Sequence, residues 1–322
     1  PNGNYKVQVI IVQFLLSIFL YIDTLLIVTF FQKEYFRTSM RYVFFVHTLI
    51  CDWIYLFISN ILLILTYFSM PMFAWICIIL LILMSLLTFS TPLTMVAMSL
   101  ERYIAICLPL RHAEISTSRR TIYCILFIHG LSSIQIFVVL SIFFASVSHS
   151  FYMMYKVCMV EMLIVLKWQS YVRSAISLFY FLIMSCTILF TYVKIVTAAK
   201  MAASGHKKSI TKGRNTVLLH GMQLFLGLFQ FWTPFVEPAV LSINVELYVF
   251  VRYFDYVAFI LAPRCLCPLV YGLRDKKFFS AVKYYVFSMP CYRAHVAQQK
   301  ATRTRIVCKS RLNPACHIPQ FV

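Results

Sequence analysis

Long apolar stretches alternate with short polar connections along most of the chain. Each stretch is long enough to cross the hydrocarbon core of a bilayer as a helix, which takes about 20 residues. The pattern predicts seven such helices: Val7–Phe31, Tyr42–Tyr67, Ala74–Leu100, Thr121–Ser146, Tyr171–Thr197, Thr216–Leu241 and Leu247–Tyr271. Because the connections are short, we predict an all-α membrane protein, a seven-transmembrane helix bundle within one domain at residues 1–291.

Composition supports this reading. The chain is 61% hydrophobic and only 12% charged, about half of the charged fraction typical of soluble domains. An enzyme is not expected, because the sequence has no Gly-X-Ser-X-Gly elbow, no His-Glu-X-X-His pair and no Walker loop. We therefore predict no catalytic residue, no metal site and no cofactor.

The basic residues gather on one side of the predicted membrane. They follow the first, third, fifth and seventh helices, at Lys33, Arg37, Arg41, Arg102, Arg111, Arg119, Arg120, Lys194, Lys200, Lys207, Lys208, Lys212, Arg214 and throughout 274–311. By the positive-inside rule this side is cytoplasmic. We predict a multi-pass plasma-membrane protein with its N-terminus extracellular and its C-terminus cytoplasmic. The net charge of +19 then reflects topology, and no nucleic-acid partner is expected.

The most informative stretch is residues 98–112. Glu101, Arg102 and Tyr103 come at the end of the third apolar stretch, before a predicted turn at 109–112. An arginine at the membrane edge needs a partner, and the neighbouring carboxylate of Glu101 is the expected one. This stretch resembles the third helix of rhodopsin-like (class A) G-protein-coupled receptors, and residues 104–112 resemble their odorant (olfactory) receptor branch.

Other motifs extend the resemblance through nearly the whole chain. Residues 47–52 resemble the aspartate motif of the second helix, 231–235 the Trp-X-Pro hinge of the sixth, and 263–275 the end of the seventh in odorant receptors. Residues 212–220 resemble the fish-type branch. The chain departs from the superfamily at three positions: Asp23 and Cys267 stand where asparagine is usual, and His129 where tryptophan is usual.

The resemblance implies a receptor that binds a small odorant from outside and activates a heterotrimeric G protein of the stimulatory, olfactory type. The activation switch that it implies consists of Glu101, Arg102, Tyr103, Tyr192, Trp232, Pro234, Pro268 and Tyr271. For the two tyrosines, anchoring at the membrane interface is the alternative. A receptor for a non-odorant small molecule or a peptide stays open, as does, more remotely, a transporter. A retinal-binding receptor is excluded because Leu247–Tyr271 contains no lysine.

Three ionisable residues lie deep within predicted helices: Asp23, Asp52 and Arg264. Such residues must face the bundle interior and find partners. Many rhodopsin-like receptors hold a sodium ion at this depth. We hypothesise that the guanidinium of Arg264 replaces the cation here and bridges Asp52 and Asp23, since its fork can bind two carboxylates. A purely structural ion pair is the alternative.

Alignment to the family motifs gives a set of inward-facing candidates for ligand binding, mostly apolar with a few hydroxyl groups. They are Met84, Ser85, Thr88, Ile176, Ser177, Tyr180, Phe181, Trp232, Phe235, Val257 and Ile260. Met84 stands where amine receptors have an aspartate, so an amine ligand would lack its usual counter-ion. For each residue, core packing is the alternative role.

The predicted orientation sorts the 11 cysteines. Only Cys77 and Cys158 fall on the oxidising outer side. Rhodopsin-like receptors have a disulfide between the third helix and the second outer loop, and the resemblance implies that Cys77 and Cys158 form it. Two free buried thiols are the alternative.

The cytoplasmic segments carry further predictions. The segment Lys194–Arg214 has six basic residues and no acidic one, which suits anionic membrane lipids, a G protein, or both. After the seventh helix, alternating basic and aromatic residues predict a short amphipathic helix at about 274–287. Cys291 is a weak candidate for palmitoylation. The basic tail at 292–322 is expected to be disordered.

Overall fold

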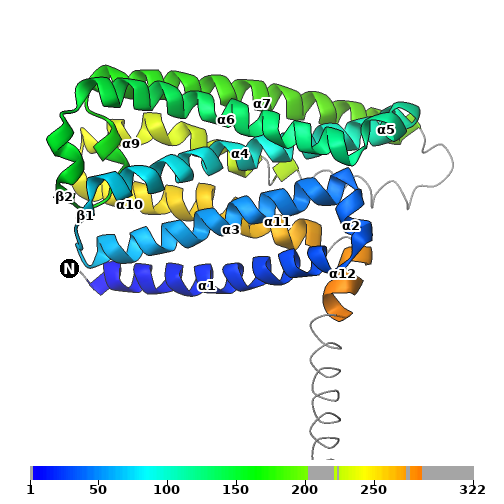
Figure 1. The fold of residues 1–322 in the computed structure, drawn as a ribbon, viewed down its shortest axis with the longest axis horizontal. Coiled ribbons are helices and arrows are strands. Elements are labelled where there is room, and N and C mark those ends of the chain that lie inside the picture. Colours follow the sequence, from blue (N-terminus) through cyan, green and yellow to red (C-terminus); the bar gives the residue numbers. More distant parts are fainter. Residues whose placement is uncertain (1–2, 202–220, 223–224, 273–275, 285–322) are drawn as a thin grey trace, which may run out of the picture. The chain divides into compact units, whose positions relative to one another are not determined.

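The computed structural model describes residues 3–201, 221–222, 225–272 and 276–284. The chain divides into two compact units, Pro1–Gly272 and Leu273–Val322. In the first unit the long helices lie side by side (Figure 1). The helical bundle expected from the apolar pattern is therefore present in this unit.

Five helices in the described part of the chain are long and apolar enough to cross a membrane. They belong to α1 (Gly3–Gln32), α3 (Met40–Tyr67), α4 (Ala74–Cys107), α6 (Ser118–Ser146) and α7 (Lys167–Met201). Each contains the corresponding predicted span. The largest difference is at α4, which continues to Cys107 and so holds Glu101, Arg102 and Tyr103 within the helix.

The sixth span is described from Phe225, where an apolar helical stretch runs to Leu241. Its predicted start at Thr216 lies outside the described residues. Within it, a 3₁₀ turn at Gln230–Trp232 precedes α9 (Thr233–Leu241). Pro234 sits in the first turn of α9, where its missing N–H is not needed for helix hydrogen bonding.

The seventh span changes its helical type twice. It consists of α10 (Val245–Asp255), a π-helical turn (Tyr256–Leu261) and α11 (Ala262–Gly272). The side chain of Asn244 caps α10 by accepting a hydrogen bond from the Glu246 amide (2.7 Å), which satisfies one of the unpaired donors at the helix start. π-helical turns are rare and often occur at functional sites.

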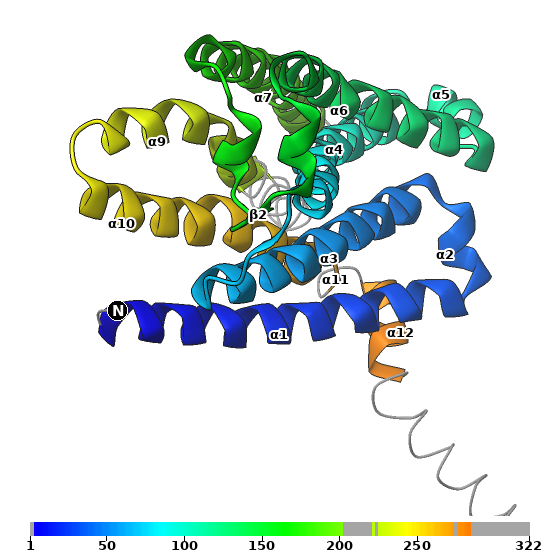
Figure 2. The same cartoon turned by 60° about the vertical axis from the view of Figure 1, so that its left-hand side comes forward.

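Short elements connect the helices at the two ends of the first unit (Figures 1 and 2). At one end, β1 (Met72–Phe73) pairs antiparallel with β2 (Tyr155–Lys156), beside two 3₁₀ turns at His149–Met153 and Val160–Leu163. At the other end lie α2 (Glu34–Thr38) and α5 (Pro109–Ile115). Sequence analysis predicted a turn at 109–112, and this was wrong: proline is a favoured first residue of a helix, and α5 begins there.

Three clusters of buried side chains form the core of the first unit. One joins α1, α3, α4 and the seventh span around Leu16, Leu56 and Leu261. The second lies below the β1–β2 ladder around Phe143. The third joins α4, α7 and the sixth span around Phe231. The first and third clusters lie on either side of the polar groups that make up the site described below.

The second unit is described over 276–284 and contains α12 (Lys276–Lys283). This helix falls within the predicted amphipathic segment. Phe278 and Ala281 are buried, whereas Lys277, Ser280 and Lys283 are exposed together with Phe279, so the buried side of the helix is apolar and the exposed side mostly polar. Cys291 and the tail 292–322 lie outside the described residues.

Candidate functional site

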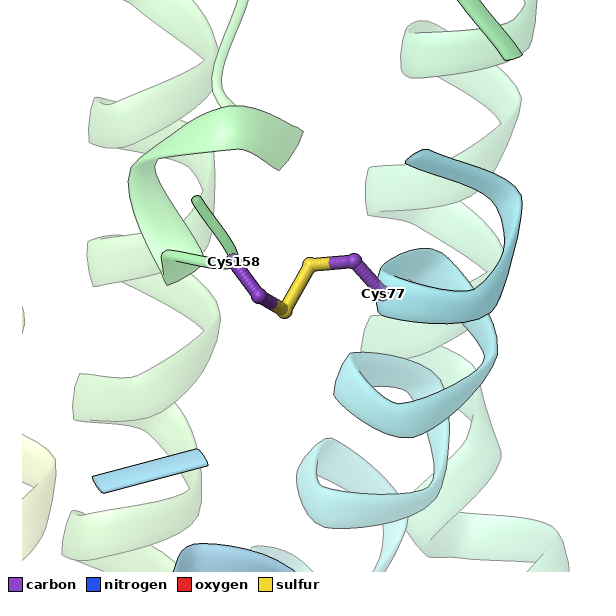
Figure 3. The surroundings of a disulfide bond; sticks show 2 residues. All are labelled: Cys77 and Cys158. Carbon is purple, nitrogen blue, oxygen red and sulfur yellow. A yellow bond between two sulfur atoms is a disulfide. The ribbon is translucent and has the colours of Figure 1, made fainter. Parts of the chain in front are cut away.

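A disulfide between Cys77 and Cys158 fixes the loop that follows α6 to the first turns of α4 (Figure 3). The two Cα atoms are 5.5 Å apart, within the range that this bond requires. The pairing implied by the sequence is confirmed, and the alternative of two free thiols was wrong. The bond holds the 3₁₀ turn Val160–Leu163, which follows Cys158 closely in the chain, near the end of the bundle where β1 and β2 pair.

Below this turn lies a cavity of about 370 Å³, within the usual size range of small-molecule sites. The α3, α4, α7 and α9 helices, the seventh span and the loop after β2 all contribute to its wall. The lining residues are Tyr55, Ser59, Met84, Thr88, Val160, Glu161, Ile164, Ser170, Arg173, Gln230, Thr233, Pro234, Glu237, Pro238, Leu241, Tyr248, Arg252, Asp255, Tyr256 and Ile260.

An ion pair joins the loop to the seventh span across this cavity. Arg252 binds the carboxylate of Glu161, and Tyr248 donates a hydrogen bond to the same Glu161 oxygen (3.0 Å). Burial by itself raises the pKa of Glu161, but the positive charge of Arg252 and the hydrogen bonds outweigh it and leave that pKa below its ordinary value. Glu161 therefore stays ionised at neutral pH and joins the loop to the seventh span.

The cavity also holds charges outside this pair. Within the described part of the chain, nothing accepts a hydrogen bond from Nε of Arg173, although that atom is buried. Two more acidic side chains, Glu237 and Asp255, line the same cavity. Buried charges are costly unless they are paired, so this combination of one underused cation and two acids favours a ligand that is itself charged.

Tyr55 lines the cavity and also contacts Arg264, which belongs to a cluster of buried polar groups deeper in the bundle. The carbon at the centre of the Arg264 guanidinium lies 3.9 Å from the Tyr55 ring centroid, a cation–π contact. Nearby, the hydroxyl groups of Ser59 and Tyr256 share a hydrogen bond of 2.7 Å. Tyr256 is the first residue of the π-helical turn, so the cavity borders the irregular part of the seventh span directly and reaches Arg264 through Tyr55.

Arg264 forms a buried ion pair with Asp52, and the two side chains are 3% and 0% exposed. Thr91 completes the cluster: it donates to Asp52 Oδ1 (3.0 Å) and accepts from Arg264 (3.2 Å). Asp23 is also buried, but its Oδ1 has no hydrogen-bond partner among the described residues. The structure thus pairs Arg264 with Asp52 and shows no bridge from Arg264 to Asp23.

The predicted ligand-binding residues divide into three groups. Met84, Thr88 and Ile260 line the cavity. Those that lie instead within or against the buried core are Ile176, Ser177, Tyr180, Phe181 and Val257, while Ser85 is half-buried. Trp232 and Phe235 are exposed, at 45% and 38%, and the Trp232 ring lies 5.9 Å from the ring of Phe181. Phe231 is buried where Trp232 was expected, because the 3₁₀ turn Gln230–Trp232 rotates the chain before Pro234.

On the inner half of the bundle, the structure gives Glu101 the partner His112, with Nε2 3.0 Å from the carboxylate. His112 lies on α5, so this contact joins α5 to the end of α4. The ring centroids of Tyr103 and Phe190 lie 5.6 Å apart, so the two rings pack against each other. Arg102 and Tyr192 are half-buried and Pro268 is buried in α11. Tyr271 belongs to the last turn of α11, and its side chain lies outside what the structure describes.

Sequence reasoning missed the charged residues of the cavity: Glu161, Arg173, Glu237, Arg252 and Asp255. The sequence does contain a signal for the helical members of this set. Ionisable residues within apolar helices must face the bundle interior or a water-filled cavity, and this rule was applied only to the deepest three. The outer positions of the others made them look like loop residues.

Comparison with known proteins agrees with this architecture. Residues 23–271 match the family model of the 7 transmembrane receptor (rhodopsin family). The chain belongs to this family of receptors, and within it to the odorant receptors. It is 40% identical over 286 residues to Odorant receptor 131-2 of Danio rerio, an alignment that covers 89% of this chain and 88% of the relative.

Proposed function

We propose that this receptor binds a small zwitterionic odorant of amino-acid size in the cavity beneath the Cys77–Cys158 loop. The observation that carries the proposal is the set of charges that line one enclosed space. The ligand carboxylate pairs with Arg173, whose guanidinium has an unused donor. The ligand ammonium group pairs with Glu237 and Asp255, which line the same cavity.

The charge balance supports a zwitterion over a neutral volatile compound. Glu161 and Arg252 neutralise each other, which leaves one cation and two acids around the cavity. A neutral ligand would displace water from these groups without replacing its hydrogen bonds, at a cost for each unpaired group. A ligand with an ammonium and a carboxylate group supplies a partner for the acids and a partner for the cation. Its ammonium group does not need the aspartate that amine receptors have at the position of Met84.

Binding is transmitted through Tyr55 and the π-helical turn. A ligand that displaces the Tyr55 ring changes the contact with Arg264 and so the stability of the Arg264–Asp52 pair. We infer that this shifts a two-state equilibrium of the bundle, in which the inner end of the sixth helix moves outward. Arg102 then meets a heterotrimeric G protein of the stimulatory, olfactory type at the cytoplasmic face. The proposal places the N-terminus and the cavity outside the cell, and the C-terminus inside.

The test is expression with an olfactory G protein and a cyclic-AMP reporter, with surface delivery measured on the same cells. Amino acids, bile acids, steroids and volatile odorants are the ligand panel. We expect amino acids to activate. Arg173→Gln is expected to raise the half-maximal concentration at least tenfold, about 1.4 kcal/mol. Lys156→Gln, which alters a basic residue outside the cavity, should leave it unchanged.

Each outcome bears on a different part of the proposal. Activation by uncharged odorants alone, or an unaffected Arg173→Gln receptor, would refute the zwitterion assignment. Silence toward the whole panel despite normal surface delivery would count against an odorant as ligand. A receptor with Arg102→Ala should still reach the surface but give no cyclic AMP, and normal signalling from it would refute the proposed coupling.

A further inference from the structure

Two histidines and a cysteine converge between α3 and α6, away from the ligand cavity. Nε2 of His47 lies 3.0 Å from Nε2 of His129, and Sγ of Cys51 lies 3.7 Å from Nε2 of His47. The three potential ligand atoms all lie within 4.8 Å of one another. We propose that these side chains bind Zn²⁺ and thereby tie the second helix of the bundle to the fourth.

The hydrogen bonds behind the two rings determine where their protons are. Thr94 Oγ1 lies 3.1 Å from Nδ1 of His47, but its own proton goes to the Ser90 carbonyl (2.7 Å). A hydroxyl group has one proton, so this oxygen can only accept from the ring. Nδ1 of His47 therefore carries the hydrogen, and its Nε2 presents a lone pair.

The same reasoning holds for the second ring. Ser90 Oγ lies 3.1 Å from Nδ1 of His129 and donates its proton to Ser132 Oγ (3.1 Å). Ser132 in turn donates to the Ile128 carbonyl (2.8 Å). Nδ1 of His129 must therefore carry the hydrogen, and its Nε2 is a second lone pair, directed at the first.

Two lone pairs facing each other at 3.0 Å repel, so a positive charge must lie near them. The thiol proton of Cys51 can serve only one of the two nitrogen atoms. An added proton would leave an imidazolium charge between apolar helices, and an isolated buried charge is costly. A metal ion accepts both lone pairs at once, and the thiolate of Cys51 offsets part of its charge. On binding, the thiol proton is released to solvent.

The distances suit zinc. In a tetrahedral site with bonds of about 2.0 Å to nitrogen and about 2.3 Å to sulfur, neighbouring nitrogens lie about 3.3 Å apart, and nitrogen and sulfur about 3.6 Å. The observed 3.0 and 3.7 Å need adjustments of a few tenths of an ångström, and Sγ of Cys51 and Nε2 of His129, which lie within 4.8 Å of each other, must approach by up to about 1.2 Å to reach the nitrogen–sulfur spacing of a tetrahedral site. Imidazole and thiolate ligands favour Zn²⁺ over Mg²⁺ and Ca²⁺, which prefer oxygen. Ligating histidines almost always donate their other ring N–H to an oxygen acceptor, and here the hydroxyl oxygens of Thr94 and Ser90 take that place.

The site has a structural consequence beyond binding. His47 and Cys51 lie on α3 and His129 on α6, while the supporting Ser90 and Thr94 lie on α4. A bound ion therefore cross-links α3 and α6 over the face of α4. Cys51 also directly precedes Asp52, so the ion would restrain the backbone that carries the buried partner of Arg264.

The test uses the full chain, purified in detergent without a histidine tag and stripped of metal. Co²⁺ serves as the spectroscopic probe, because tetrahedral Co²⁺ with a thiolate ligand gives visible ligand-field bands and a near-ultraviolet charge-transfer band. We expect one Co²⁺ per chain with both features, displaced by Zn²⁺ but not by Mg²⁺. Absence of these bands in the folded wild-type receptor would overturn the proposal, and this measurement requires no variant.

Variants then assign the ligands. Cys51→Ser should abolish the charge-transfer band, and His129→Ala should remove the Zn²⁺-induced rise in melting temperature that the wild-type receptor shows. Cys124→Ser, on the same helix as His129, and His149→Ala, in the outer loop, are the matched controls and should behave as wild type. If Cys51→Ser keeps the charge-transfer band, or a control loses it, the metal is bound elsewhere and the proposed site is wrong.

Discussion

The guanidinium of Arg264 lies between the ring of Tyr55, 3.9 Å from its centroid, and the carboxylate of Asp52. Tyr55 also lines the outer cavity. One side chain thus contacts both this cavity and an ion pair whose two side chains are buried inside the bundle. The predictions below test this connection and the elements that support it.

Removing the cation should destabilise the bundle. Arg264→Ala leaves the Asp52 carboxylate buried without its partner, which typically costs 3–5 kcal/mol. We expect a lower melting temperature and poor surface delivery. The double variant Asp52→Leu/Arg264→Met, which replaces the pair by apolar groups, should recover most of the stability. If the recovered receptor also signals normally, the pair is purely structural and has no role in switching.

The Tyr55 ring should matter more than its hydroxyl group. Tyr55→Phe keeps the cation–π contact, whereas Tyr55→Leu removes it, a difference of about 0.5–2 kcal/mol at a desolvated site. We expect Tyr55→Leu to alter ligand-independent cyclic-AMP production several-fold and Tyr55→Phe to change it little. Equal basal activity in the two variants would show that the ring does not transmit to Arg264.

The Glu161–Arg252 pair should give the outer loop a pH dependence. Because the folded-state pKa of Glu161 is below its ordinary value, the pair stabilises the closed loop above the unfolded pKa, about 4.3. This contribution is lost as the pH falls through the lower, folded-state pKa. Thermal melts of the wild-type receptor and of Glu161→Gln, recorded from pH 7 downward, should converge in acid. Parallel curves would show that Glu161 is not coupled to folding.

The disulfide should be needed for delivery to the cell surface. It closes a loop with a sequence separation of 81 residues, and losing such a bond typically costs 2–5 kcal/mol. We expect Cys77→Ala, Cys158→Ala and the double variant to lose surface expression to the same extent, because each removes the same bond. Cys186→Ala, at an exposed free cysteine, is the control. A double variant much worse than either single one would point to a further role of the thiols.

In the sixth helix, the family motif and the observed packing assign the inward-facing position to different aromatic residues. Phe231 is 3% exposed in the core and Trp232 is 45% exposed. Phe231→Ala should therefore cost about 3–5 kcal/mol, and Trp232→Ala much less, as measured by thermal unfolding in detergent. The reverse order would mean that the Trp-X-Pro motif, rather than the 3₁₀ turn, decides which ring faces inward.

The sequence predicted the helices because they depend on local signals, and it predicted the disulfide because a family motif marks the two cysteines. Long apolar runs must span about 20 residues, and the cysteine pairing follows from a well-marked family motif. The cavity could not be predicted in the same way. Glu161 and Arg252 meet across 91 residues, and a contact between a loop and a helix depends on packing that no periodicity encodes. The helix that begins at Pro109 was missed because a proline can begin either a turn or a helix.

The π-helical turn at Tyr256–Leu261 changes how the seventh helix must be read on a helical wheel. A π turn accommodates one residue more than an α turn, so residues beyond it are offset by one position, about 100°, from where an uninterrupted wheel would put them. Tyr256, the first residue of this turn, borders the cavity. The positions of Pro268 and Tyr271 around the helix axis therefore cannot be extrapolated from residues before the π turn. They have to be assigned again from Leu261 onward.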